Sequence, residues 1–300
     1  MKLKIINLIL LFILLSLTSF SSQTIKDALG NSYTPSLTPQ RIVSLAPNIT
    51  EILFALDLGE KIVGVTRFCD YPQEALAKEK IGGMIDLNLE KIKSLNPDLV
   101  IGFRGNPIRI LERLKKLKTH VFVLEMGPNV ESVFAIIETI GQITKRDKES
   151  AALVGSMKER YSKIQSTLHP INHKPKVFLL LHGTGFWTCG GQSFLNDLLI
   201  KAKGLNIAGD IQRRWLNYNL EQLIHQNPDI IIILAKSKEN FRRTKENLKR
   251  SSGFKGIRAV KEDLIYFLDE NIATRPGPRL LEALTRLAHI FHPGKFIQEQ

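Results

Sequence analysis

The 300-residue chain is poor in cysteine and in aromatic residues. It has two cysteines, too few for a cysteine-ligated zinc or iron–sulfur cluster within one chain. Hydrophobic residues make up 43% of it and charged residues 24%, which excludes a disordered chain, a collagen-like repeat and a small disulfide scaffold. Its one long apolar run lies at the N-terminus, so we expect the mature protein to be soluble.

Residues 1–22 have the three-part pattern of a secretory signal peptide. Lys2 and Lys4 give a basic start, an apolar run extends from Leu8 to Leu17, and small residues close it. A membrane-spanning helix needs about 20 apolar residues, which is more than this run supplies. Because no cysteine lies near the cleavage region to carry a lipid, we expect cleavage and release into the periplasm.

Basic residues outnumber acidic ones by 42 to 29, which gives a formal net charge of +13. Part of the excess lies in residues 240–250, where five lysines and arginines fall on a predicted helix. The export signal argues against nucleic-acid binding. We expect a solvated basic face, and the charge could also favour anionic ligands or membrane surfaces.

Apolar runs alternate with helical patterns from residue 42 onward, which is typical of a parallel α/β sheet. Strands are predicted at 42–45 and 62–65, with a helix between them. Asn48 with Glu51 three residues later has the spacing of a capping box, which predicts that Asn48 caps this helix.

An internal repeat indicates two similar halves. Residues 88–101 read NLEKIKSLNPDLVI and residues 219–232 read NLEQLIHQNPDIII, with seven of 14 positions identical. In each copy an asparagine precedes a short predicted helix, Asn-Pro-Asp ends it, and an apolar run follows as a strand. The repeat therefore predicts two lobes of similar topology.

The region between the repeats, residues 129–168, has no strand pattern, and its apolar residues recur at helical spacing. It predicts a long helix from one lobe to the other, with Lys145–Asp147 as the point where it could break. The predicted fold class is α/β, with two similar lobes joined by a long interdomain helix. Its parts are a signal peptide (1–22), an N-terminal α/β lobe (23–128), a linking helix (129–170) and a C-terminal α/β lobe (171–300). A disulfide between Cys69 and Cys189 would tie the lobes across the cleft and is disfavoured, although the periplasm is oxidising.

Ligands of open α/β sheets bind beyond the carboxyl ends of the strands. Aromatic and arginine side chains gather after the predicted strands, although aromatic residues make up only 7% of the chain. These segments are 66–71, 102–106, 182–187 and 269–275. A cleft lined in this way suits a large, flat ligand that is partly apolar and partly anionic.

Four segments resemble the periplasmic binding proteins for vitamin B12, haem and ferric siderophores, which serve ABC importers. They read RIVSLAPNITEILFALDLGEKIVGVT, CDYP, GGMIDLNLEKIKSLNPDLVIG and WLNYNLEQLIHQNPDIII. The resemblance covers about residues 24 to 292 and is closest to the cobalamin-binding branch. It implies the class III periplasmic-binding-protein fold, with little hinge motion, and a monomer that works with a permease and an ATPase.

The resemblance also implies a set of ligand-binding residues in the cleft. They are Arg67, Phe68, Met84, Phe103, Arg104, Trp187, Trp215, Asn271 and Arg275. Met84 and Phe103 stand where the cobalamin-binding branch has tryptophans, and Asn271 stands where it has an aspartate. The resemblance further implies that Glu90 and Glu221, at equivalent positions of the repeat, dock the two lobes on arginines of the permease. An acidic residue in the first turn of a helix is also favoured by the helix dipole alone.

Two residues are candidate iron ligands and one alternative is enzymatic. His182 could bind haem iron, although a single histidine is more often satisfied by hydrogen bonds, and Tyr71 is the second candidate. A chelatase-like enzyme on the same fold would depend on His182 and Asp70. We expect a binding protein instead, with no catalytic residue, resident metal or cofactor, whose transported ligand is cobalamin, haem or a ferric siderophore.

Overall fold

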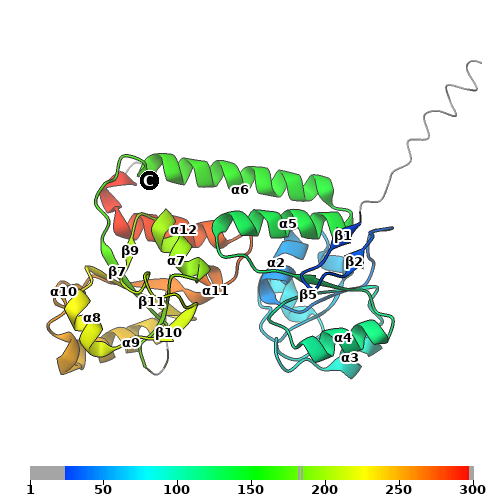
Figure 1. Cartoon of the computed structure of the whole chain (residues 1–300), viewed down its shortest axis with the longest axis horizontal. Coiled ribbons are helices and arrows are strands. Elements are labelled where there is room, and N and C mark those ends of the chain that lie inside the picture. Colours follow the sequence, from blue (N-terminus) through cyan, green and yellow to red (C-terminus); the bar gives the residue numbers. More distant parts are fainter. Residues whose placement is uncertain (1–23, 182, 184, 297–300) are drawn as a thin grey trace, which may run out of the picture.

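The computed structural model describes residues 24–181, 183 and 185–296, which form two α/β lobes bridged by helices (Figure 1). The signal peptide predicted over residues 1–22 lies outside this part of the chain. Within it, no helix combines the length and the apolar character needed to cross a membrane.

The N-terminal lobe is built on a parallel four-stranded sheet in the order β4-β3-β5-β6. Its strands are β3 (Ile42–Ser44), β4 (Ile62–Val65), β5 (Leu99–Phe103) and β6 (Val121–Leu124). Its helices are α2 (Pro47–Ala55), α3 (Leu89–Ser94) and α4 (Ile108–Lys116), with 3-10 turns η1 (Gly59–Lys61) and η2 (Gln73–Ala77). A short hairpin of β1 (Ile25–Lys26) and β2 (Ser32–Tyr33) precedes the sheet.

The C-terminal lobe has a second parallel sheet, in the order β12-β11-β7-β9. Its strands are β7 (Lys176–Leu181), β9 (Leu205–Asn206), β11 (Ile230–Ala235) and β12 (Ile265–Asp269). Its helices are α7 (Phe194–Lys201), α8 (Leu220–Gln226), α9 (Lys238–Arg250), α10 (Arg258–Lys261), α11 (Glu270–Ala273) and α12 (Leu280–Phe291), with 3-10 turns η3 (Ser252–Phe254) and η4 (Pro293–Lys295). An antiparallel pair, β8 (Trp187–Cys189) and β10 (Trp215–Asn217), lies beside the sheet.

The two sheets have the same topology, which confirms the two similar lobes predicted from the repeat. In each sheet the strand that comes first along the chain (β3 or β7) lies between the second strand (β4 or β9) and the third strand (β5 or β11). The fourth strand (β6 or β12) pairs with the third at the edge of the sheet. The third strands, β5 and β11, follow the short helices α3 and α8 of the two repeat copies. All six residues of β11 are buried, as expected for a strand covered on both faces.

The linking segment is broken at the predicted point, Lys145–Asp147, so residues 129–170 do not form one continuous helix. It forms two helices, α5 (Val130–Thr144) and α6 (Asp147–Leu168), which pack side by side (Figure 1). Lys145 ends α5 in the left-handed conformation with a φ of 58°, so the chain reverses there. As a result, α6 alone runs the distance from one lobe to the other (Figure 1).

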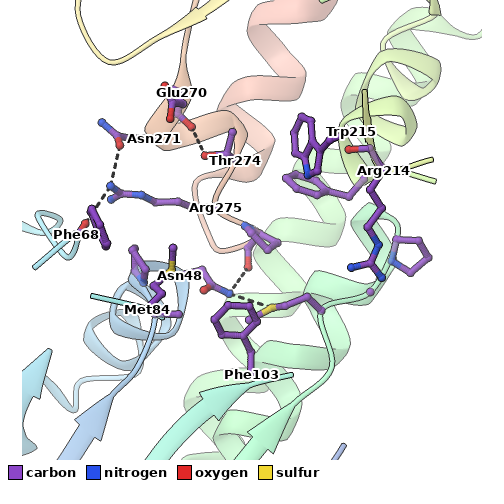
Figure 2. A pocket seen from close by; sticks show the side chains of 18 of the residues that line it. Asn48, Phe68, Met84, Phe103, Arg214, Trp215, Glu270, Asn271, Thr274 and Arg275 are labelled. Atoms are coloured by element: carbon purple, nitrogen blue, oxygen red, sulfur yellow. Dashed lines mark hydrogen bonds between the residues drawn. The ribbon is translucent and has the colours of Figure 1, made fainter. Parts of the chain in front are cut away.

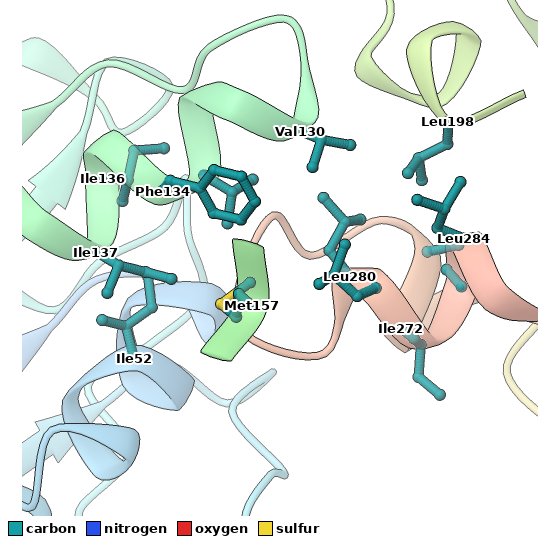
Figure 3. Packing of buried hydrophobic residues seen from close by; sticks show 14 of the residues in the cluster. Ile52, Val130, Phe134, Ile136, Ile137, Met157, Leu198, Ile272, Leu280 and Leu284 are labelled. Atoms are coloured by element: carbon teal, nitrogen blue, oxygen red, sulfur yellow. The ribbon is translucent and has the colours of Figure 1, made fainter. Parts of the chain in front are cut away.

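The lobes share one continuous hydrophobic cluster on the side of these helices (Figure 3). It includes Ile52 and Ile137 at the N-terminal lobe, Met157 on α6, and Leu280 and Leu284 on α12. Separating the lobes here would expose apolar side chains to water, at about 25 cal/mol per Å². This packing agrees with the expectation of little hinge motion.

The capping box predicted at Asn48 is wrong. Helix α2 begins one residue earlier, at Pro47, and Ala46 is the capping residue, without a side-chain hydrogen bond. Proline is favoured at the first helical position, because it has no amide hydrogen to satisfy and its φ angle suits a helix. Asn48 therefore lies inside the first turn, and its side-chain amide donates to the carbonyl of Pro276 at 3.2 Å and to the sulfur of Met126 at 3.4 Å.

Candidate functional site

A cleft of about 700 Å³ lies between the lobes, at the carboxyl ends of strands from both sheets (Figure 2). Its volume lies within the range of small-molecule binding sites. Its lining includes aromatic, methionine and charged side chains from both lobes: Asn48, Phe68, Met84, Phe103, Glu125, Met126, Phe194, Arg214, Trp215, Lys236, Glu270, Asn271 and Arg275.

The wall formed by the N-terminal lobe is apolar. Phe68 follows β4, Phe103 ends β5, and Met84 lies on the same side of the cleft (Figure 2). Met126, which follows β6, also lines the cleft. Trp215 faces this wall from the C-terminal lobe. Phe68 is 41% exposed and Trp215 38% exposed, so the two rings offer apolar surface that the protein itself leaves uncovered.

Two cations of the C-terminal lobe provide positive charge in the cleft. Arg214 precedes Trp215, and Lys236 follows the last residue of β11. Both are exposed, and neither forms an ion pair with a carboxylate among the residues that the structure describes. They are therefore available to a ligand carboxylate or phosphate.

The third cation of the cleft, Arg275, is already engaged across the lobe boundary. Its guanidinium donates to Asn271 at 2.7 Å, to the backbone carbonyl of Phe68 at 3.2 Å and to Glu51 at 3.3 Å, and it also pairs with Asp70. Its side chain is only 10% exposed. Arg275 therefore holds the lobes together, which leaves its guanidinium little capacity to bind a ligand.

Glu51 is the centre of this interlobe ion cluster, which comprises Glu51, Asp70, Arg275 and Arg279. Glu51 is 3% exposed and accepts hydrogen bonds from Arg279 at 2.6 and 2.9 Å in addition to the one from Arg275. Arg279 also lies 3.7 Å from the centroid of the Tyr71 ring. Burial alone would raise the pKa of Asp70, but the hydrogen bonds and charge of Arg275 hold it below its ordinary value, so the Asp70 carboxylate stays ionised at neutral pH.

Six of the nine predicted ligand-binding residues line the cleft. They are Phe68, Met84, Phe103, Trp215, Asn271 and Arg275.

The other three do not line it. Arg67 pairs with Asp86 at 2.6 Å, and Arg104 pairs with Glu125 at 2.9 Å. Trp187 is 47% exposed in β8, but it does not line the cleft. The candidate iron ligand His182 lies outside the described residues.

The two glutamates predicted to dock on the permease occupy matching places in the two lobes. Glu90 and Glu221 each lie in the first turn of a short helix, capped by the side chains of Asn88 and Asn219. Both are exposed. Their helices, α3 and α8, lie on the side of the molecule away from α6 (Figure 1).

Four of the residues of the cleft and its ion cluster that sequence reasoning missed are Asn48, Glu51, Arg214 and Lys236. Lys236 had a usable signal, because it directly follows the apolar run of β11, where the rule on strand ends applies. Arg214 had a weaker one in its position next to Trp215. Glu51 had none, because its partners lie 224 and 228 residues away along the chain.

Both cysteines are unpaired and buried, one in each lobe, as expected. Burial raises the pKa of the Cys69 thiol, and it raises that of Cys189 to about 12. Neither thiol is therefore reactive at neutral pH.

Comparison with known proteins identifies similar chains. A family model described as "Periplasmic binding protein" matches residues 42–272. An uncharacterized ABC transporter substrate-binding lipoprotein of Bacillus subtilis is 33% identical over 279 residues, covering 91% of this chain and 86% of that protein. A vitamin B12-binding protein of Vibrio vulnificus is 28% identical over 261 residues, covering 84% and 90%. Among solved structures, the periplasmic heme-binding protein RhuT of Roseiflexus in its apo form aligns with a TM-score of 0.78 and 28% identity, covering 85% of this chain and 99% of that one.

Proposed function

Because the chain belongs to the periplasmic binding protein family, we propose that it captures a metal-containing macrocycle or chelate in its cleft for an ABC importer. It is the substrate-binding component of that importer, and cobalamin or a related corrinoid is the first candidate ligand. The observation that carries the proposal is the cleft itself, an apolar wall on one lobe facing two unpaired cations on the other.

Haem is the second candidate ligand, and the charge of the cleft favours it. A haem combines a flat macrocycle with two carboxylates, which would match the exposed rings of Phe68 and Trp215 and the cations Arg214 and Lys236. A similar protein of known structure is named as heme-binding. The replacement of two tryptophans of the cobalamin-binding branch by Met84 and Phe103 also changes the surface on which a corrin would stack.

Tryptophan fluorescence tests the site directly, because the chain has only Trp187 and Trp215. Titration of the mature chain with cobalamin, haem or a ferric siderophore is expected to quench Trp215, which lines the cleft. The W187F variant should keep most of the quenching and the W215F variant should lose most of it. Because phenylalanine keeps a smaller aromatic ring, W215F should weaken binding by at most about 0.5–1.5 kcal/mol, read from ligand absorbance. Full quenching with an unchanged midpoint in W215F would place the ligand elsewhere.

Removing the two free cations is expected to distinguish the candidate ligands. Exposed ion pairs contribute about 0.2–1 kcal/mol each, so R214A/K236A should bind haem roughly tenfold more weakly. Cobalamin, whose corrin edge carries neutral amides, should lose less affinity. The matched control is R213A, which removes an exposed arginine beside the cleft that does not line it. Equal losses in R213A and R214A/K236A would contradict the assigned role of the cleft cations.

The enzymatic alternative, a chelatase-like activity, receives less support. Of the two residues on which it depends, Asp70 is engaged by Arg275, and His182 lies outside the described residues. The family is one of binding proteins. Turnover in a metal-insertion assay would favour the enzyme, whereas stoichiometric binding without turnover would favour the transport role.

The proposed role also assigns a location and partners. The mature chain, after removal of residues 1–22, acts in the periplasm as a monomer and delivers its ligand to a permease driven by an ATPase. Glu90 and Glu221 form the contact with the permease, one from each lobe, and their exposure on equivalent helices supports this assignment.

A further inference from the structure

We propose that two basic helices, α4 and α9, bind anionic phospholipid headgroups beside the permease and so orient the docking face toward the membrane. The inference rests on the proposed function, since it concerns the face that carries Glu90 and Glu221. One basic helix belongs to each lobe. Both lie on the side of the molecule away from α6 (Figure 1).

Helix α4 presents a stripe of cations without partners. Arg109, Arg113 and Lys116 are spaced four and three residues apart, which places them on one face of the helix. All three are exposed, and within the described part of the chain none forms an ion pair with a carboxylate. The opposite face is anchored by buried Leu111 and Leu114. The stripe therefore faces solvent and keeps a net positive charge, although the exposed Glu112 lies beside it, three residues after Arg109 and four before Lys116.

Helix α9 of the C-terminal lobe also carries a stripe of lysines and arginines on one face. Lys238, Arg242, Lys245 and Lys249 recur at spacings of four, three and four residues and form one stripe. Lys245 and Lys249 pair with Asp263 at 2.9 and 3.0 Å, while Lys238 and Arg242 are exposed and form no ion pair among the described residues. Together with α4, the helix places unpaired positive charge on both sides of the cleft.

Each basic helix lies close to a docking glutamate. Helix α4 contacts α3, the helix that carries Glu90. Helix α8 carries Glu221, and α8 and α9 both contact the η3 turn. A permease surface that binds two glutamates must be positively charged where they dock, so it would repel α4 and α9. Charge complementarity instead favours the negatively charged lipid headgroups around the permease.

Two separated contacts explain why both lobes carry such a stripe. When one helix is bound, the other is held near the same surface, so the second contact forms at a high effective concentration. Contact by both helices also fixes the direction of the docking face, which contact by one would leave free to rotate. The attraction acts within about one Debye length, roughly 8 Å at physiological salt, and weakens as salt rises.

Vesicle flotation of the mature chain tests the proposal. We expect the chain to bind vesicles of phosphatidylcholine that contain about 30% phosphatidylglycerol, which gives them a strongly negative surface. Binding should be lost at high salt, and vesicles of pure phosphatidylcholine should not bind the chain. The variants R109E/R113E in α4 and K238E/R242E in α9 should each bind at least about tenfold more weakly. The control is K148E/K174E, which changes the net charge equally at exposed positions in and just after α6.

Three results would overturn the proposal: no binding to anionic vesicles, equal binding to neutral ones, or an equal loss in K148E/K174E. The last would show that net charge alone attracts the protein to the membrane. Ligand titration of the same variants keeps the two hypotheses apart, because the substituted residues do not line the cleft. Failure of vesicle binding with normal ligand affinity would remove the membrane contact and leave the proposed function intact.

Discussion

Replacing Glu51 with alanine is expected to lower the free energy of unfolding by about 3–5 kcal/mol, because breaking a buried ion pair leaves uncompensated charge. Arg275 and Arg279 would lose their shared carboxylate while their side chains remain only 10% and 15% exposed. Asp70 would still compensate Arg275 in part, which favours the lower end of this range. Equilibrium unfolding in urea, followed by circular dichroism, measures the change.

Two further variants keep this prediction specific to the interlobe ion cluster. E51Q retains a hydrogen-bond acceptor and should cost less than E51A. E74A removes an exposed glutamate and should stay within about 0.5 kcal/mol of the parent chain. A loss below about 1 kcal/mol in E51A would show that the ion cluster contributes little to stability.

The ion cluster should also make stability depend on pH in the acidic range. The pKa of Asp70 is lowered in the folded protein, so its contribution is present above its unfolded pKa of about 3.9. That contribution is lost as the pH falls through the lower folded value. The D70N variant should therefore show a weaker dependence of stability on pH below about pH 4 than the parent chain.

Removing both docking glutamates is expected to abolish uptake without changing ligand affinity. Glu90 and Glu221 lie in exposed first turns outside the cleft, so E90A/E221A should bind ligand normally and fold with little loss of stability. Each single variant should lose part of the transport rate, since one lobe would still dock. Transport into proteoliposomes that hold the cognate permease and ATPase measures this effect.

A double variant elsewhere on the surface controls for the change in charge. E60A/E159A removes two exposed glutamates that lie on neither α3 nor α8. It should transport as the parent chain does. Normal uptake by E90A/E221A would remove the docking role, and reduced ligand affinity would indicate that the substitutions act through the fold.

The sequence alone predicted the parts of the fold that depend on local patterns. The apolar runs at residues 42–45 and 62–65 and the Asn-Pro-Asp breaks marked strands that the structure contains, and the repeat predicted the shared topology of the sheets. Phe68 and Phe103 were identified because strand ends can be located from apolar runs. These features are encoded within a few residues of where they act.

Features that depend on distant partners could not be predicted in the same way. Arg67 and Arg104 have the chemistry of ligand-binding residues, but they pair with Asp86 and Glu125, and neither arginine lines the cleft. The role of Arg275 is fixed by carboxylates more than 200 residues away in sequence. The reversal between α5 and α6 was also missed as a hairpin, because its left-handed residue is a lysine and not the usual glycine.

The apolar cluster that joins the lobes limits how such a protein can be divided or recombined. A fragment ending after α5 would leave Ile52 and Ile137 without the packing of α6 and α12, and the second lobe cut away alone would expose Leu280 and Leu284. We therefore expect neither half to be stable by itself and the whole chain to unfold in a single step. A chimera that exchanges one lobe for the corresponding lobe of a relative must therefore carry matching apolar side chains where the lobes meet. The two lobes share a topology, but each has to fit the other for the chain to pack stably.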